Sequence, residues 1–537
     1  MNASLSFALS LFISIALVPV FMRYATTLGL VDTPDGLRKI HTKIIPRSGG
    51  IAIAIAFFLT VIYLSPDIKM LSYLVGALVI VFVGVLDDRF ELAFYWKFFG
   101  QIIATLVFMS GDISFNNIPF IDQLNIPGWL VNTIVFLFIM SVTNAIALSD
   151  GLDGLTAGTI VVSLGFIGYL GFCSNEPIIL SVAMAIIGAL LGFLRYNTHP
   201  AIVFMGDTGS QFLGFSAACL AVLVTQLETS TVSPLLPIII FSLPIIDMMM
   251  VMAIRIYYKK SPFSADKNHI HHQLIKIGFH HYEAVALIYL IQFLLIFIGY
   301  IFRFESDLFI IILFISIAIT SISTVIMAKI YQWKVHDDHN RSTKKERRNL
   351  FFRKFNWIYI NSATIISISL VSVWFIFSLT STSFVKDNES LSLLSLTLIL
   401  ISLTLLFFFK RLQTVSTRVI SYSVSALVLY PFSFIDHMIV VKILDFSLMI
   451  MAVLLLFVVR LTRKNQFRVD NQDILVLFIL LSAPLLSSAT SFIETGTMLL
   501  RLVVMIYAIE YVINRNTENH SLLNFGGLFA LAIISLT

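Results

Sequence analysis

The chain has 537 residues, of which 58% are hydrophobic and only 12% charged, and its mean hydropathy is +0.94. A water-soluble domain of this length does not reach such values, so the composition indicates a polytopic membrane protein. The formal net charge of +5 is confined to a few short loops, which bears on membrane topology and not on nucleic-acid binding. Cys173 and Cys219 lie in or near apolar runs, so they form neither a disulfide framework nor a metal-ligand pattern.

The first part of the chain contains a regular series of apolar runs. A bilayer-spanning helix needs about 20 such residues, and eleven runs approach that length, at 3–22, 49–64, 69–86, 98–111, 128–147, 158–173, 177–194, 211–227, 233–257, 283–302 and 307–330. Arg23 follows the first run, and no lysine or arginine precedes it. We therefore expect an uncleaved anchor whose N-terminus lies outside.

Basic residues are concentrated in every second loop of this series. The loops at 23–48, 87–97, 148–157, 195–210, 258–282 and 331–356 hold most of the lysines and arginines, whereas 111–127 contains neither. Because basic loops stay in the cytoplasm, the six basic loops are predicted to share the cytoplasmic face.

A second region follows the basic segment 331–356. That segment is predicted to be a cytoplasmic linker lying along the membrane surface. It divides a domain at 1–330 from an extension at 357–537, and the extension carries apolar runs at 357–379, 391–409, 419–435, 439–459, 472–491, 495–513 and 521–536. The predicted fold class is thus all-α, with about eleven transmembrane helices in the first domain and six or seven in the extension. The extension has no dense acidic or histidine cluster.

The chemistry-bearing side chains of the first domain fall in the loops predicted to face the cytoplasm. An acidic side chain at the edge of a membrane span costs free energy and usually has a function. They occur as Asp87 and Asp88 at the end of the third run and as Asp150 and Asp153 in SDGLDG, followed by Asp207 in FMGDTGS. Asp150 and Asp153 are three residues apart, a spacing that puts two side chains on one face of a helix. The basic partners are Lys97, Arg255, His269, His271 and His272.

Several of these positions also have purely structural interpretations. Asp87 and Asp88 could simply end a span, and the segment 206–210 could cap a helix. Asp247 lies within an apolar run, where Arg255 or Lys97 would be a suitable buried partner. The three histidines could bind zinc, but hard acidic ligands around glycine turns suit magnesium or manganese better. Histidines can instead hold phosphate oxygens.

The combination of residues indicates the kind of substrate. Carboxylates beside lysine, arginine and histidine favour an anionic substrate bridged by a divalent cation, and a diphosphate fits this description. A remaining carboxylate can align or deprotonate an attacking phosphate. A polar site at the membrane face with apolar walls predicts one lipid substrate and one soluble substrate.

Four motifs in this order, GVLDDRF, NAIALSDGLDGLTAG, FMGDTGS and SPFSADKNHIHH, resemble those of the polyprenyl-phosphate N-acetylhexosamine-1-phosphate transferases. The resemblance covers about residues 1–330 and is specific because four motifs agree. The HIHH form is most similar to the bacterial branch that moves GlcNAc-1-phosphate from UDP-GlcNAc to undecaprenyl phosphate with release of UMP. This implies a multi-pass enzyme of the bacterial inner membrane with its active site on the cytoplasmic face.

The resemblance also implies roles for individual residues. Asp207 would bind Mg²⁺, with Mn²⁺ as the alternative, and Asp87 and Asp88 would act near the phosphates, one of them as the base. The expected substrate-binding residues are Lys97 at the phosphates, Phe204 stacked on the uracil, Asn144, Asp150 and Asp153 along the nucleotide pocket, and Arg255, His269, His271 and His272 at the diphosphate and sugar. Expected partners are a UDP-HexNAc, undecaprenyl phosphate and membrane lipid, with a second copy or downstream glycosyltransferases as further candidates.

The chain departs from the family pattern at two points. Many members carry a second asparagine, which helps to hold the metal, at the position of Ala147, and a methyl group cannot coordinate magnesium. The extension at 357–537 is the second departure. For it the alternatives are a structural or partner-binding role, a polymerase- or ligase-like module, or a scaffold for the next glycosyltransferase.

Two other functions compete with the leading one. The first is phosphotransfer from UDP-MurNAc-pentapeptide, which ranks lower because that branch arranges its histidines differently. The second is a non-catalytic polyprenyl-phosphate carrier or flippase, which would not need a divalent-metal diphosphate site. Within the leading function, UDP-GalNAc, UDP-FucNAc and UDP-QuiNAc remain alternative donors. The product would start a cell-surface polymer such as O-antigen, enterobacterial antigen, teichoic acid or capsule.

Overall fold

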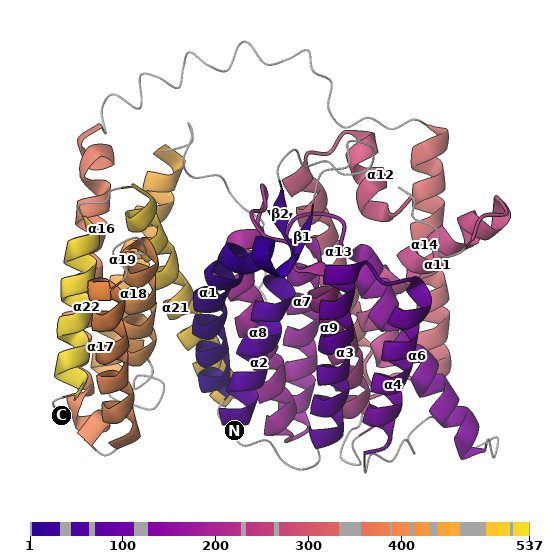
Figure 1. Ribbon diagram of the computed structural model, residues 1–537, viewed down its shortest axis with the longest axis horizontal. Helices are drawn as coiled ribbons and strands as arrows, with labels where there is room; N and C mark the ends of the chain where they lie inside the picture. Colours follow the sequence, from indigo (N-terminus) through magenta and orange to yellow (C-terminus); the bar gives the residue numbers. More distant parts are fainter. Residues whose placement is uncertain are drawn as a thin grey trace. The chain divides into compact units, whose positions relative to one another are not determined.

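The computed structural model describes residues 3–32, 44–63, 70–111, 127–226, 232–261, 268–331, 356–386, 389–408, 413–429, 438–461, 490–515 and 519–535 (Figure 1). These residues are almost entirely helical, which confirms the predicted all-α membrane fold. They divide into two compact units, which are described separately.

The first unit contains the helices α1 to α14 and one small sheet. Its helices are α1 (Ala3–Leu28), α2 (Gly49–Tyr63), α3 (Leu71–Phe90), α4 (Phe94–Met109), α6 (Gly128–Ser149), α7 (Leu155–Cys173), α8 (Pro177–Asn197), α9 (Gly206–Thr225), α10 (Leu236–Ile240), α11 (Ser242–Tyr257), α12 (Ile270–Ile277), α13 (His281–Ile301) and α14 (Asp307–Ile330). The strands β1 (Val31–Asp32) and β2 (Ile45–Pro46) pair antiparallel. Figure 1 shows β1, β2 and α12 at one end of the unit's long helices.

Each of the eleven predicted runs of the first domain corresponds to a helix of this unit, with one difference. The ninth run is divided at Phe241 into α10 and α11. Pro237 and Pro244 lie in the first turns of these two helices, where a residue without an N–H group is tolerated. Among the described residues, nine helices are long and apolar enough to cross a membrane, and eight of them belong to this unit.

Helix α9 forms the centre of the first unit and is buried along nearly its whole length. It packs against α2, α3 and α6, and glycines allow the closest approaches. A Cβ atom on Gly50 would lie 2.3 Å from the Gly209 nitrogen, and one on Gly84 would lie 2.5 Å from the Thr208 Cα atom. Small residues let helix backbones approach closely inside a membrane. The first turn of α9 is therefore held by the ends of α2 and α3.

The second unit consists of α16 (Asn356–Lys386), α17 (Glu389–Phe408), α18 (Gln413–Leu429), α19 (Met438–Leu461), α21 (Thr490–Arg515) and α22 (Asn519–Ser535). These helices correspond to six of the seven runs predicted after the linker. Most of the remaining run, at 472–489, and linker residues 332–355 lie outside the described residues.

Charged pairs connect helices inside this second unit. Arg418 Nε contacts Glu510 Oε1 at 2.8 Å, and the Tyr422 hydroxyl also donates to Glu510. Arg501 Nε contacts Asp445 Oδ1 at 2.7 Å. The sequence predicted no dense acidic cluster here, and it gave no sign that single acids would find basic partners on other helices.

Candidate active site at the end of the first unit

Asp88 at the end of α3 positions the first turn of α9. Its Oδ1 atom accepts a hydrogen bond from the Asp207 N–H at 2.8 Å, and its Oδ2 atom accepts from the Thr208 N–H at 2.9 Å and the Thr208 hydroxyl at 2.5 Å. A helix N-terminus has unsatisfied N–H groups, and a carboxylate satisfies them well. A helix does begin within 206–210, as the structural interpretation of this segment expected, but the group that caps it comes from α3.

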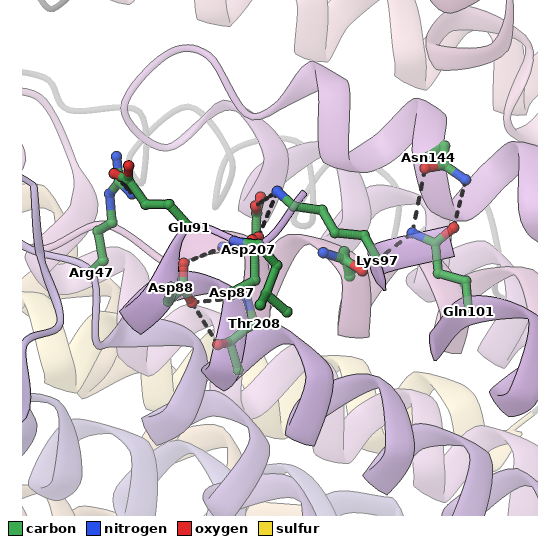
Figure 2. A network of polar contacts seen from close by, with 11 residues as sticks. Arg47, Asp87, Asp88, Glu91, Lys97, Gln101, Asn144, Asp207 and Thr208 are labelled. Carbon is green, nitrogen blue, oxygen red and sulfur yellow. Dashed lines mark hydrogen bonds and ion pairs between the residues drawn. The ribbon is translucent and has the colours of Figure 1, made fainter. Parts of the chain in front are cut away.

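Lys97 in the first turn of α4 joins two carboxylates. Its Nζ atom lies 2.6 Å from Asp87 Oδ2 and 2.5 Å from Asp207 Oδ2. Figure 2 shows Lys97 reaching toward Asp207, with Asp88 and Thr208 next to it. Side-chain exposure separates the two acids, since it is 37% for Asp207 but 2% for Asp87. Asp207 is thus the more accessible of the carboxylates that share Lys97.

Asn144 on α6 belongs to a neighbouring amide network. It donates from Nδ2 to Gln101 Oε1 at 2.7 Å and to the Met140 carbonyl at 2.8 Å, while Gln101 donates to Gln211 Oε1 at 3.2 Å. Figure 2 shows the Gln101–Asn144 pair beyond Lys97. These amides link α4, α6 and α9 next to the acidic cluster, so the contacts of Asn144 connect helices.

The segment containing Asp150 and Asp153 is a loop and not a helix, which corrects the expectation from their spacing. Asp150 ends α6, and α7 begins at Leu155. Gly154 has a φ of +77°, a left-handed conformation that glycine adopts without strain. Both acids nevertheless line the same cavity, because the loop crosses its wall.

Asp153 is held by groups that follow α8. Its Oδ2 atom accepts from His199 Nδ1 at 2.7 Å and from the Ala201 N–H at 3.1 Å. Burial acts to raise the pKa of Asp153, but these two hydrogen bonds and the nearby His281 outweigh it and hold the pKa below its usual value. Asp153 is therefore a carboxylate at neutral pH.

Asp247 has a different partner from the two predicted. Its Oδ2 atom accepts from His269 Nδ1 at 2.8 Å, and its Oδ1 atom accepts from the Ile270 N–H at 2.8 Å, so it anchors the start of α12. Lys97 contacts Asp87 and Asp207 instead. Arg255 is buried on α11. His269 and Asp247 thus fix the position of α12, and neither is among the residues that line the cavity described below.

The other two histidines of α12 differ in their surroundings. His271 is buried against Gly151, where a Cβ atom would lie 2.1 Å from His271 Nε2. Burial, together with the neighbouring His272 and His269, lowers the pKa of His271 to about 3. His272 lines the cavity. His271 is consequently neutral at physiological pH, whereas His272 is placed to meet a ligand.

A cavity of about 850 Å³ joins these groups. Of the predicted site residues, those lining it are Asp88, Asp150, Asp153, Phe204, Asp207 and His272. Ala147, where the family pattern has an asparagine, lines it too. The volume lies within the range of roughly 300–1,000 Å³ typical of ligand pockets.

Further cavity residues were not predicted from the sequence as site residues. Arg47 lines the cavity and is ion-paired with Asp32, the last residue of β1. His199 and His281 also line it. The pairing of β1 with β2 brings Arg47 into place, and such a long-range contact leaves no local sequence signal.

The acidic cluster fits a divalent cation bound by oxygen. Both carboxylate oxygens of Asp88 accept hydrogen bonds from α9, and the side chain of Asp87 is buried. Asp207 is therefore the acid of this cluster best placed to bind a cation in the cavity. Carboxylate oxygen suits Mg²⁺ or Mn²⁺. Among the described residues, ligand atoms with metal-binding spacing occur at Asp153, His199 and His281, and not among the histidines of α12 suggested as a zinc site.

A polar cavity with acids, lysine, arginine and histidine, at one end of a bundle of apolar helices, defines a membrane-embedded enzyme for phosphorylated substrates. Residues 70–225 match the family model described as glycosyl transferase family 4. The chain is 39% identical over 293 residues to the probable undecaprenyl-phosphate N-acetylglucosaminyl 1-phosphate transferase of Bacillus subtilis (strain 168), covering 54% of this chain and 82% of the relative.

Two further relatives carry the name undecaprenyl-phosphate alpha-N-acetylglucosaminyl 1-phosphate transferase. The protein of Escherichia coli O157:H7 is 32% identical over 302 residues, covering 54% of this chain and 82% of the relative. The protein of Yersinia pestis is 32% identical over 300 residues, covering 53% of this chain and 80% of the relative. The chain therefore belongs to the polyprenyl-phosphate N-acetylhexosamine-1-phosphate transferase family, and it is a multi-pass membrane sugar-1-phosphate transferase.

Proposed function

We propose that the chain transfers GlcNAc-1-phosphate from UDP-GlcNAc to undecaprenyl phosphate, releases UMP and so starts a lipid-linked glycan. The site would face the cytoplasm at a bacterial inner membrane. The names of the relatives support this donor and acceptor. The observation that carries the proposal is the Asp87–Lys97–Asp207 cluster beside a cavity of about 850 Å³.

The reaction is a phosphoryl transfer. An oxygen of the lipid phosphate attacks the donor phosphorus that carries the sugar. The bond from this phosphorus to the bridging oxygen breaks, and UMP leaves with that bonding electron pair. Catalysis of such a step consists mainly of positioning and of neutralising charge on the phosphoryl oxygens.

Asp207 would hold Mg²⁺, with Mn²⁺ as the alternative. The bound ion would neutralise charge on the diphosphate and orient it. Asp88 acts through α9, since its contacts with the Asp207 and Thr208 N–H groups fix where Asp207 lies. Asp88 is thus a positioning residue in this proposal.

Lys97 and Asp87 would serve the transfer itself. Lys97 lies between Asp87 and Asp207, and its ammonium group can turn to contact a phosphate oxygen. Asp87 is then the carboxylate that aligns the lipid phosphate and accepts its proton. This assignment separates the two adjacent acids, because Asp88 is committed to the first turn of α9.

The remaining cavity residues would bind the donor. Arg47 and His272 line the cavity and offer N–H donors for phosphate oxygens. Phe204 lines it as well, and its backbone is fixed by hydrogen bonds with Pro46 and Gly49. A fixed aromatic ring suits stacking on the uracil.

The test is UMP release by the purified full chain with undecaprenyl phosphate and Mg²⁺. UDP-GlcNAc, UDP-GalNAc and UDP-MurNAc-pentapeptide would be offered separately, and we expect the highest kcat/KM for UDP-GlcNAc. Higher turnover of the pentapeptide donor would overturn the proposed donor, and no UMP with any donor would overturn the transferase activity.

A further inference from the structure

The loop between α6 and α7 is fixed at Asp153 and Gly154 by side chains from two other helices or their ends. From the end of α8, Asn197 Oδ1 accepts from the Gly154 N–H at 2.9 Å. From α13, the Tyr289 hydroxyl donates to the Gly154 carbonyl at 2.5 Å. This loop is thus held more firmly than an ordinary surface turn.

Two histidines contact Asp153 itself. His199 donates from Nδ1 to Asp153 Oδ2 at 2.7 Å, and His281 donates from Nε2 to the Asp153 carbonyl oxygen at 3.3 Å. Their rings stack at 4.0 Å with an interplanar angle of 16°. One histidine therefore fixes the carboxylate, the other fixes the backbone, and the stacking fixes the two rings relative to each other.

All three side chains line the cavity. A carboxylate repels phosphate oxygens, so Asp153 must meet a part of the ligand that donates hydrogen bonds. On the proposed donor these are the imide N–H of the base and the hydroxyl or amide N–H groups of the sugar. We propose that His199 and His281 are positioning residues that hold Asp153 for these donor groups; this inference rests on the proposed function.

A metal ion bound by the same three residues is the competing interpretation, because their ligand atoms lie within 4.8 Å of one another. The geometry favours hydrogen bonding. The His199–Asp153 distance of 2.7 Å is shorter than the separation of about 3.3 Å between two ligands of a tetrahedral zinc site. In addition, His281 Nε2 faces a backbone carbonyl, which accepts its proton.

The test compares alanine with amide replacements at both histidines. His199→Ala and His281→Ala should raise the KM for UDP-GlcNAc, by roughly 10- to 100-fold for the charge-assisted bond of His199 and by less for His281. The kcat and the KM for undecaprenyl phosphate should change little. His199→Asn and His281→Gln place an amide N–H near the lost Nδ1 or Nε2 donor and should restore most of the affinity.

His280→Asn is the matched control. His280 precedes α13 next to His281 and caps the helix, and asparagine preserves such a cap while removing the imidazole. This variant should behave as the wild type in KM, kcat and thermal stability.

Direct binding of UDP and of GlcNAc-1-phosphate identifies the group that Asp153 meets. Weaker UDP binding by the alanine variants indicates the base, and weaker GlcNAc-1-phosphate binding indicates the sugar; both support the proposal. If KM and ligand binding are unchanged in both alanine variants, the positioning role of His199 and His281 is overturned. Turnover by the wild type would still support the proposed function in that case. Amide variants as defective as alanine, with a Co²⁺ absorption band that both histidine substitutions remove, would overturn it in favour of a metal site. No wild-type turnover would overturn the proposed function separately.

Discussion

The two units of the protein pair their charged side chains in different arrangements. In the first unit, Asp87, Asp207 and Lys97 meet beside a large cavity. In the second unit, Arg418 meets Glu510, and Arg501 meets Asp445, in separate pairs between helices. A pair of opposite charges is neutral and can hold two helices together. Two acids around one lysine instead leave a net negative charge, which a bound cation can balance. An unbalanced cluster of charged side chains beside a cavity therefore indicates a functional site more reliably than the burial of a charged side chain does.

Removing Asp207, the more accessible of the two acids that contact Lys97, should have the largest effect. Asp207→Asn keeps the size of the side chain but removes the charge that would hold Mg²⁺. A bound metal supplies several kcal/mol of transition-state stabilisation, so kcat should fall roughly 1,000-fold or more. Steady-state UMP release measures this change, with the thermal unfolding midpoint as the control. Turnover close to that of the wild type would remove Asp207 from the metal role.

Breaking a pair in the second unit should change stability and not catalysis. Glu510→Ala removes the carboxylate that Arg418 and Tyr422 contact, and loss of one partner of a buried pair costs about 3 kcal/mol or more. Denaturant unfolding in detergent measures this loss, while kcat for UMP release should be retained.

Asp445→Asn provides the matched comparison for Glu510→Ala. The Asp445 side chain is 51% exposed, so its pair with Arg501 is screened by solvent and should contribute less than about 1 kcal/mol. A large fall in kcat in the Glu510 variant at unchanged stability would show that the second unit takes part in the chemistry.

Acid should destabilise the first unit through His271. The pKa of His271 is lowered from 6.5 to about 3 in the folded chain, so between these values the unfolded chain holds a proton that the folded chain lacks. Stability therefore falls as pH drops below 6.5, by up to about 1.4 kcal/mol per pH unit. His271→Gln should remove this part of the pH dependence, as unfolding at pH 7 and pH 5 would show. Equal pH dependence in both proteins would mean that His271 takes up its proton in the folded state.

Ala147→Asn should produce the smallest change, and in the favourable direction. Ala147 lines the cavity, and an amide there adds an oxygen ligand for Mg²⁺. We expect the Mg²⁺ concentration for half-maximal UMP release to fall on the order of tenfold. An unchanged Mg²⁺ requirement would place Ala147 away from the ion.

The sequence predicted the helices of the first unit well because apolar runs of membrane length are a strong local signal. It also predicted that the acids of separate loops would come together at one end of these helices. It could not predict that Asp88 caps α9, that Asp247 binds His269, or that His199 and His281 hold Asp153. These contacts join residues 22 to 128 positions apart, and they depend on helix packing that no local pattern encodes. The loop conformation at Asp153 was missed because a spacing of three residues fits a helix and a turn equally well.

The most direct test of the central claim follows the phosphorus that carries the sugar. Purified full chain would be given undecaprenyl phosphate, Mg²⁺ and UDP-GlcNAc with a radioactive label in the β-phosphate. If the cluster around Asp207 transfers GlcNAc-1-phosphate, the label will appear in an organic-extractable lipid diphosphate, together with one UMP for each lipid formed. Label remaining in UDP-GlcNAc, or released as water-soluble GlcNAc-1-phosphate without a lipid product, would contradict this claim.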